Sequence, residues 1–220
     1  MTTFFNIAVM FGVLLGALGV ALAAIRLIDR LVFPNTNFQH ELRANNLAVG
    51  VVVAALILGI FLLAGRAVGA SLHRYDDGFR RWGRVHFGYA TDWRFFQAQG
   101  MTESGLRPEV CSHAGACGLM QFMPGTAAAM GLVNRFDARE SIRAGIAYDR
   151  RLWNQWTAPR PAPDRLKLAF ASYNAGLGHV LAAQRRANGA NPYAAIAPHL
   201  WPEPREYVER IGRWRQRFTP

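Results

Sequence analysis

Two long apolar runs dominate the first third of the chain. Residues 4–25 and 47–65 carry no charged side chain, and the polar stretch 26–46 separates them. Each run is long enough to cross a hydrocarbon core of about 30 Å as a helix that rises about 1.5 Å per residue. The pattern therefore predicts two transmembrane helices with a short polar loop, within residues 1–70.

The rest of the chain has a different pattern. From residue 91 onward, apolar positions recur with helical spacing, and short breaks are marked by glycine and proline. We find no alternating β-branched segment long enough to predict a strand. The longest helix is expected from about Asp137 to Trp156. Residues 91–220 are thus predicted to form a mostly α-helical domain.

Residues 71–90 connect these two parts and combine aromatic and basic side chains. Apolar residues recur every three to four positions among arginines that include Arg74, Arg80, Arg81 and Arg84. One interpretation is a basic amphipathic linker helix that lies on lipid headgroups. The other is a core or linker helix of the domain that follows. The pattern alone supports both.

The N-terminal run has two further interpretations. A cleaved signal peptide could end at Ala21-Leu22-Ala23, but no positive residue precedes the run and the run is too long. Gly12 and Gly16, like Gly65 and Gly69, have the spacing that lets helix backbones approach closely in lipid. This spacing suggests helix-mediated self-association or a membrane-protein partner.

Composition narrows the choice of partners. The 220 residues are 51% hydrophobic, which is enough to bury a core and excludes a long disordered protein. Lys and Arg number 25 against 14 Asp and Glu, so the net charge is +11. Such a charge favours nucleic acid, anionic lipid or an anionic cell-wall polymer. Because the arginines are spread along helices and no nucleic-acid motif appears, we expect membrane lipid and glycan, not nucleic acid.

Glu103 is the candidate for acid–base chemistry. It ends an apolar helix and is followed by an irregular, glycine-rich loop. A carboxyl in that position can be partly desolvated and still face a cleft, and desolvation raises its pKa toward neutral pH. Taken alone, a glutamate there is more often a cap or a solvated residue.

Four separated blocks of sequence change that interpretation. They are Glu103-Ser104-Gly105, residues 115–124, residues 171–176 (ASYNAG) and residues 203–208 (EPREYV). In this order they resemble the SLT family of lytic transglycosylases, relatives of goose-type lysozyme. The resemblance covers roughly residues 92–215 and implies a lysozyme-like helical fold.

The resemblance also implies roles for individual residues. Glu103 matches the single catalytic acid/base of the family. Other matches would bind substrate around it, namely Ser112, Gln121, Met123, Tyr173, Asn174, Glu203 and Tyr207. Packing offers an alternative for some of them, since Met123 and Tyr207 could be core residues and Asn174 could serve the turn before Gly176.

The implied reaction is cleavage of the β-1,4 bond between N-acetylmuramic acid and N-acetylglucosamine in peptidoglycan. Glu103 would protonate the leaving oxygen and then take the proton of the C6 hydroxyl, which closes a 1,6-anhydro ring; no cofactor or metal is implied. Two alternatives stay open. A hydrolytic muramidase normally needs a second carboxylate, and a catalytically inactive membrane module could bind peptidoglycan without cutting it.

The substrate class and the charge pattern predict opposite topologies. Peptidoglycan lies outside the inner membrane, so a working enzyme would be inner-membrane bound with its catalytic domain in the periplasm. The arginines after the second span outnumber those of the loop 26–46, which by the positive-inside rule favours a cytoplasmic domain. Because the implied substrate lies outside the inner membrane, we expect the catalytic domain in the periplasm despite the arginine distribution.

Cys111 and Cys117 are the two cysteines of the chain. In an oxidising compartment they could form a disulfide that closes the loop beside Glu103. A zinc site with His113 lacks an evident fourth ligand. Free buried thiols are the third alternative.

Overall fold

The computed structural model describes residues 51, 54–55, 58–63 and 72–218. Contacts divide the chain into two compact units, Met1–Ser71 and Leu72–Pro220. The predicted span 4–25, most of the span 47–65 and both glycine pairs lie outside the described residues. Among the described residues, no helix is long and apolar enough to cross a membrane.

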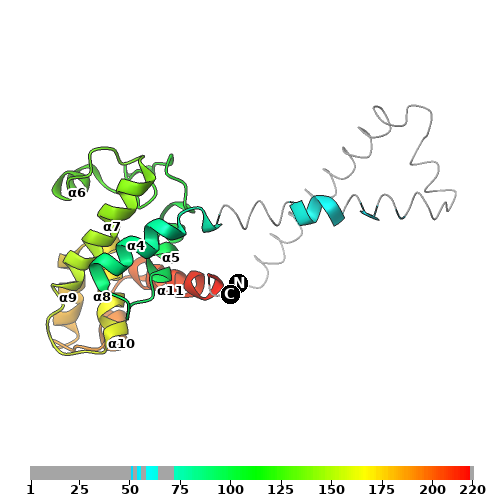
Figure 1. The fold of residues 1–220 in the computed structure, drawn as a ribbon. Helices are drawn as coiled ribbons and strands as arrows, with labels where there is room; N and C mark the ends of the chain where they lie inside the picture. Colours follow the sequence, from blue (N-terminus) through cyan, green and yellow to red (C-terminus); the bar gives the residue numbers. More distant parts are fainter. Residues whose placement is uncertain (1–50, 52–53, 56–57, 64–71, 219–220) are drawn as a thin grey trace. The chain divides into compact units, whose positions relative to one another are not determined.

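The second unit is built of helices (Figure 1). In chain order they are α4 (Asp76–Phe87), α5 (Arg94–Ser104), α6 (Pro124–Ala129), α7 (Ala138–Trp153), α8 (Ala162–Ala175), α9 (Leu177–Arg186), α10 (Tyr193–Ile196), the 3-10 helix η1 (Ala197–His199) and α11 (Pro202–Arg217). Extended pairing within residues 72–218 is limited to two isolated bridges, which join Cys117 to Cys111 and to Phe122. The prediction of a mostly helical domain is confirmed.

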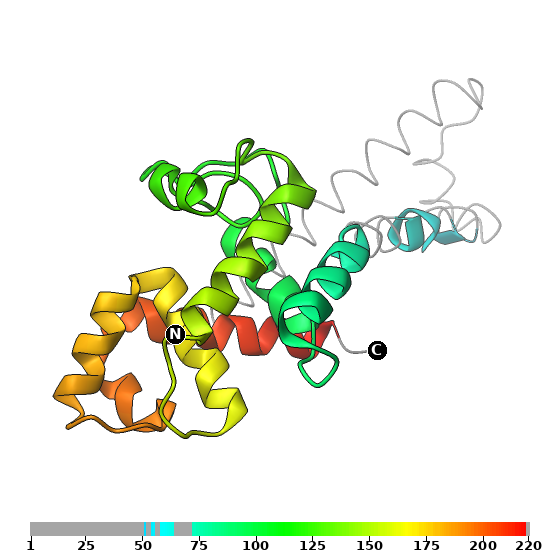
Figure 2. The ribbon, with the colours of Figure 1, turned by 60° about the vertical axis from the view of Figure 1, so that its left-hand side comes forward.

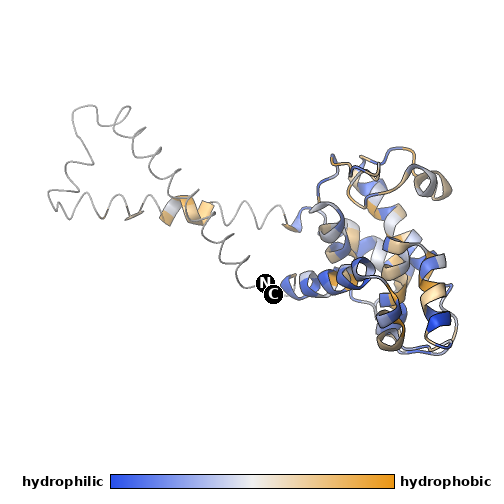
Figure 3. Ribbon diagram, turned by 180° about the vertical axis from the view of Figure 1, so that it is seen from behind, coloured by the Kyte–Doolittle hydropathy of each residue, from blue (hydrophilic) through white to orange (hydrophobic). Residues whose placement is uncertain are grey.

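Helix α5, which carries Glu103, packs between two other helices. It contacts α11 and α4, while α7 packs on α4 and α8, and α8 packs on α9 and α11 (Figures 1 and 2). Phe96 of α5 is fully buried and contacts the ring of Phe170 on α8. Figure 3 shows hydrophilic and hydrophobic residues interspersed along these helices, as expected of helices that bury one face.

Helix α4 belongs to this unit. Phe79 is fully buried, and a Cβ added at Gly83 would lie 3.1 Å from the Cβ of Trp93 and 3.3 Å from the ring of Phe96. Of the two interpretations of residues 71–90, the structure shows the core helix. The compact unit therefore begins at Leu72, earlier than the boundary at residue 91 expected from sequence.

Helix α7 matches its predicted start and ends before its predicted end. The carboxylate of Asp137 accepts a hydrogen bond from the backbone N–H of Glu140 at 2.9 Å, which caps the first turn. After Trp153 the chain tightens, because the N–H of Trp156 bonds to the carbonyl of Trp153 at 3.2 Å. Trp156 then turns into the core and is 1% exposed.

Candidate active site

Glu103 lies in the last turn of α5, one residue before its end. The helix stops because Gly105 adopts a left-handed conformation (φ 66°), and its N–H bonds to the carbonyl of Met101 at 3.1 Å. The chain leaves α5 there and forms a loop that we call the site loop (residues 105–123). Glu103 is partly buried beside this loop.

Tyr207 of α11 is the hydrogen-bond partner of Glu103. Its phenol donates to Oε1 of Glu103, and its side chain is 2% exposed. The bond spans 104 positions of sequence and forms because α11 packs along α5. Two residues that the sequence proposed from separate blocks are thus in direct contact. The buried phenol fills the core and meets the carboxyl, so the packing alternative for Tyr207 describes only part of its role.

The surroundings of Glu103 favour its protonated form. Burial raises the pKa of Glu103 to about 7, and this effect outweighs the hydrogen bond from Tyr207 and the charge of Arg210, which both lower the pKa. Burial, followed by the charge of Glu103, raises the pKa of Tyr207 well above its usual value of 10. Tyr207 therefore remains a neutral donor, and Glu103 can gain or lose a proton near pH 7.

A disulfide joins Cys111 and Cys117 within the site loop, with their Cα atoms 4.1 Å apart. Both sulfurs are used in this bond, which excludes the free-thiol and zinc alternatives for this state of the protein. Among the residues that the structure describes, no cluster of three or more histidine, cysteine or acidic side chains could hold a metal ion.

Gly118 and Arg135 fix the site loop in a way that the sequence analysis missed. Gly118 has φ of 85°, and a Cβ there would lie 1.8 Å from the backbone oxygen of Arg135. The guanidinium of Arg135 donates to the carbonyls of Gly115 at 2.8 Å and Phe122 at 2.9 Å. Only glycine permits this approach, because any side chain would meet the backbone of Arg135.

Side chains from three helices also hold the backbone at Leu119 and Met120. Ser104 Oγ donates to the carbonyl of Leu119 at 2.8 Å, and the Tyr173 hydroxyl donates to the carbonyl of Met120 at 2.8 Å. The N–H of Met120 donates to Ser141 Oγ at 3.1 Å. These bonds tie the site loop to α5, α7 and α8.

Tyr173 was expected to bind substrate around Glu103, and in the structure its hydroxyl is hydrogen-bonded to the site loop. Burial is the main cause that raises the pKa of Tyr173 well above 10, and the charge of Glu103 is the next. The Tyr173 phenol therefore stays neutral, and an ionised Glu103 opposes its ionisation. Asn174, the next residue, is partly buried at the end of α8.

Three proposed residues of the site loop differ in what they contact. Gln121 donates through Nε2 to the carbonyls of Gly118 at 2.8 Å and Val110 at 3.1 Å. The exposed Ser112 accepts a bond from the N–H of Ala116 at 3.1 Å through its hydroxyl. Met123 is 44% exposed, so it is not a core residue.

Glu203 lies in the first turn of α11 and is exposed. It precedes Tyr207 by four residues, so the two share one face of the helix. The roles of Ser112, Gln121, Met123, Asn174 and Glu203 toward substrate stay predictions.

A second carboxyl near Glu103 was missed by the sequence analysis. Asp149 of α7 is fully buried, and its Oδ1 accepts a hydrogen bond from Nε2 of the fully buried Gln99 at 3.2 Å. Burial raises the pKa of Asp149 well above its usual value, the bond from Gln99 lowers it, and the charge of Glu103 raises it further. An acidic residue at a core position of α7 was the signal in the sequence.

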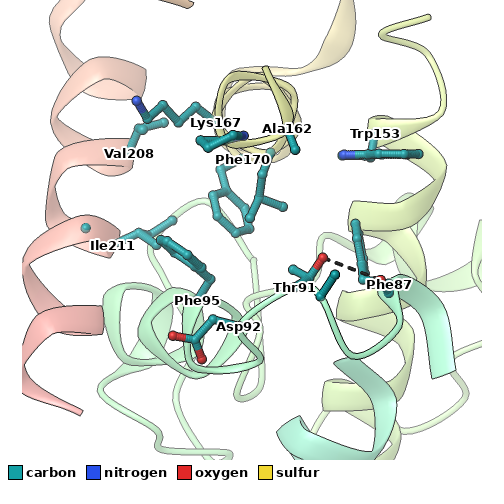
Figure 4. Close-up of a pocket in the computed structure, with 14 residues that line it drawn as sticks. Phe87, Thr91, Asp92, Phe95, Trp153, Ala162, Lys167, Phe170, Val208 and Ile211 are labelled. Carbon is teal, nitrogen blue, oxygen red and sulfur yellow. Dashed lines mark hydrogen bonds between the residues drawn. The ribbon is translucent and has the colours of Figure 1, made fainter. Parts of the chain in front are cut away.

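Two cavities in the described part of the chain are not lined by Glu103. One of about 290 Å³ is lined by apolar side chains that include Phe87, Phe95, Trp153 and Phe170, and it sits at the N-terminal end of α5 (Figure 4). A hollow of about 160 Å³ adjoins the end of α8, where Ala175, His179 and Trp201 line it. Trp201 is 51% exposed, and the centre of its ring lies 4.5 Å from the centre of the His179 ring.

Comparison with known proteins adds independent findings. Residues 82–196 match the family model of the transglycosylase SLT domain. The chain is 33% identical over 142 residues to "Membrane-bound lytic murein transglycosylase F" of Pseudomonas putida, which covers 64% of this chain and 28% of that protein. The protein of the same name from Marinobacter nauticus is 36% identical over 146 residues, with 64% and 28% covered. The chain thus spans little more than a quarter of the length of these curated relatives.

A solved structure shows the same fold. The 70 kDa soluble lytic transglycosylase of Escherichia coli superposes with a TM-score of 0.54 at 22% sequence identity, over 81% of this chain and 28% of that one. At this level of identity the likeness concerns the fold.

Proposed function

Because this chain belongs to the transglycosylase SLT domain family, we propose that it is a lytic transglycosylase that cleaves the β-1,4 bond between N-acetylmuramic acid and N-acetylglucosamine in peptidoglycan. The observation that carries the proposal is the pair of Glu103 and Tyr207 at the end of α5. A carboxyl with a pKa of about 7 is protonated in a large fraction of molecules at neutral pH, as a general acid must be.

The reaction needs two proton transfers at one carboxyl. Glu103 first protonates the leaving glycosidic oxygen and becomes a carboxylate. The phenol of Tyr207 donates to this carboxylate and stabilises it, since hydrogen bonds to a charged group are stronger than those to a neutral one. Glu103 then removes the proton of the C6 hydroxyl, the C6 oxygen attacks the anomeric carbon, and the 1,6-anhydro ring closes with Glu103 protonated again.

Glu103→Gln tests this role. The amide has the shape of the acid but cannot donate or accept the proton, so release of muropeptides from purified sacculi should fall by about 10²- to 10⁴-fold. Glu109→Gln is the matched control, because Glu109 is an exposed carboxyl in the same loop, and it should keep wild-type release. Equal release by wild type and Glu103→Gln would remove Glu103 from the chemistry. No release by the wild type would instead favour a peptidoglycan-binding module.

Mass spectrometry of the products separates the transglycosylase from a hydrolytic muramidase. An anhydromuramic end and a hydrated reducing end differ by one water. We expect the anhydro product, because Asp149, the carboxyl that interacts with Glu103, is fully buried and so cannot activate a water molecule in the cleft. Hydrated ends alone would refute the ring-closing step and leave Glu103 as a hydrolytic acid.

We further propose that residues 1–70 anchor the catalytic unit in the inner membrane and that this unit works in the periplasm. Two observations support the proposal. The relatives from Pseudomonas putida and Marinobacter nauticus carry "membrane-bound" in their names, and the disulfide of the site loop is of a kind that persists in oxidising compartments. Reporters fused after Pro220 should be active in the periplasm, and activity only in the cytosol would refute this placement.

A further inference from the structure

The contact between Gln99 and Asp149 leaves one atom of each group without a partner. Gln99 Nε2 donates to Asp149 Oδ1 at 3.2 Å. Gln99 Oε1 and Asp149 Oδ2 are buried and have no hydrogen-bond partner among the residues that the structure describes. Both are acceptors when Asp149 is ionised, and two buried acceptors without donors are costly. A proton on Asp149 Oδ2 would give both of these oxygen atoms a hydrogen-bond partner.

We propose that Asp149 holds a proton on Oδ2 at neutral pH and donates it to Gln99 Oε1, so that the two side chains form a neutral, doubly hydrogen-bonded acid–amide pair. A planar carboxylic acid and a planar amide each offer one donor and one acceptor, so the pair is complementary. Both side chains are fully buried, which disfavours an unpaired charge at this place.

The pair shares a helix face with the proposed catalytic carboxyl. Gln99 and Glu103 are four residues apart on α5 and therefore share one face of the helix. Asp149 comes from α7, so the pair joins α7 to this face of α5. In its neutral form the pair adds no second negative charge to this face of α5. This inference rests on the proposed function.

The titratable groups around Asp149 are consistent with a neutral acid. Glu103 of α5 is an acid, while Tyr148 of α7, Tyr173 of α8 and Tyr207 of α11 are phenols whose pKa values are all raised, mainly by burial. None of these groups carries a positive charge that would stabilise a carboxylate at Asp149. When Glu103 ionises during the reaction, its charge strengthens the hold of Asp149 on its proton.

Infrared spectroscopy tests the proton directly in the whole 220-residue chain. Glu103→Gln removes the only other carboxyl with a raised pKa among the described residues, and this variant should still show a carboxylic acid C=O band at pH 7. The band should shift on ¹³C-aspartate labelling and disappear in Glu103→Gln/Asp149→Asn. A spectrum with no such band, or a band that survives Asp149→Asn, would overturn the proposal. Isotope labelling gives the answer even where Asp149→Asn does not fold.

Asp149→Asn in the otherwise wild-type chain gives a second readout. The amide of asparagine can donate to Gln99 Oε1 and accept from Gln99 Nε2, and it cannot ionise. We expect a melting temperature close to that of wild type at pH 6, and a smaller loss of melting temperature between pH 6 and pH 9 than in wild type, because asparagine cannot ionise. The same loss in both proteins would contradict the neutral pair. Neither the infrared nor the melting measurement depends on glycan cleavage. A negative result in either would therefore refute the acid–amide pair without refuting the proposed function.

Discussion

The two ends of α5 each have a carboxyl, and the two carboxyls have opposite pKa shifts. At the N-terminal end, Asp92 accepts hydrogen bonds from the backbone N–H of Arg94 at 3.1 Å and from the side chain of Arg215 at 2.9 Å. Burial is the largest single effect and raises the pKa of Asp92, but these donors and the two positive charges together lower it. At the C-terminal end, burial prevails and raises the pKa of Glu103 to about 7.

The two carboxyls differ both in burial and in partners, since Glu103 is enclosed by protein more completely than Asp92. Helix α11 supplies one partner at each end, Tyr207 for Glu103 and Arg215 for Asp92. These two residues are separated by about 12 Å along the helix. A guanidinium stabilises the carboxylate, whereas a neutral phenol does so too weakly to offset burial. The comparison shows that one helix, α11, can form a structural ion pair at one end of α5 and supply the partner of a proposed proton donor at the other end.

Opening the disulfide of the site loop should have the largest effect on stability, and the loosening should be confined to the Glu103 end of α5. The double substitution Cys111→Ser/Cys117→Ser opens the disulfide, and the chain-entropy model predicts a loss of about 2 kcal/mol for so short a loop. The melting temperature should fall by about 4–8 °C. Hydrogen exchange should accelerate at the amides of Ser112 and Cys117 and stay unchanged at Arg94. Equal acceleration at both ends of α5 would show that the loop stabilises the whole unit and not the Glu103 end.

Sequence reasoning found the two contacting residues of the site and expected desolvation to raise the pKa of Glu103, but it did not predict the contact between the two side chains. The helical class of the domain, the start of α7 near Asp137 and the candidates Glu103 and Tyr207 follow from periodicity and from four sequence blocks. Helical periodicity says which face of α5 or α11 is apolar, but it does not say that Tyr207 meets the carboxyl. That contact depends on the packing of α11 along α5.

Contacts that involve backbone carbonyls were also hidden from the sequence. Tyr173 was expected to bind substrate near Glu103, and the bond from its hydroxyl to the carbonyl of Met120 was not foreseen. Every residue has a carbonyl, so no side-chain pattern marks which one will accept a bond. Gly118 and Arg135 escaped notice for the same reason, because their roles arise from backbone atoms.

Tyr207→Phe tests whether a neutral donor moderates the effect of burial at Glu103. The hydrogen bond from Tyr207 lowers the pKa of Glu103, so its removal should raise that pKa above about 7. A shift of about one unit corresponds to about 1.4 kcal/mol, the order expected for a hydrogen bond to a charged group. Because a general acid must be protonated, the alkaline limb of the kcat/KM profile should move to higher pH.

A matched control for this variant is Tyr193→Phe, which removes a phenol at the start of α10. It should leave the alkaline limb in place. If Tyr207→Phe lowers the rate at every pH without moving the limb, Tyr207 positions Glu103 or substrate and does not tune the pKa. In that case the raised pKa of Glu103 would be explained by burial and not by the partner at this end of α5.

Arg215→Gln is the smallest perturbation and acts on the opposite end. Arg215 lies 2.8 Å from Asp92 in a partly exposed ion pair, so the loss in the free energy of unfolding at pH 7 should be about 0.5–1 kcal/mol. The pKa of Asp92 is lowered in the folded protein, so this contribution exists above pH 3.8 and is lost as the pH falls through the folded pKa. Denaturant unfolding should therefore show a difference in stability between Arg215→Gln and wild type that becomes smaller in acid.

The control is Arg213→Gln, which breaks a more exposed pair with Glu209 and should change stability less. Because the partner at each end acts locally, Arg215→Gln should not move the alkaline limb set by Glu103; a moved limb would mean that α11 couples the two ends of α5.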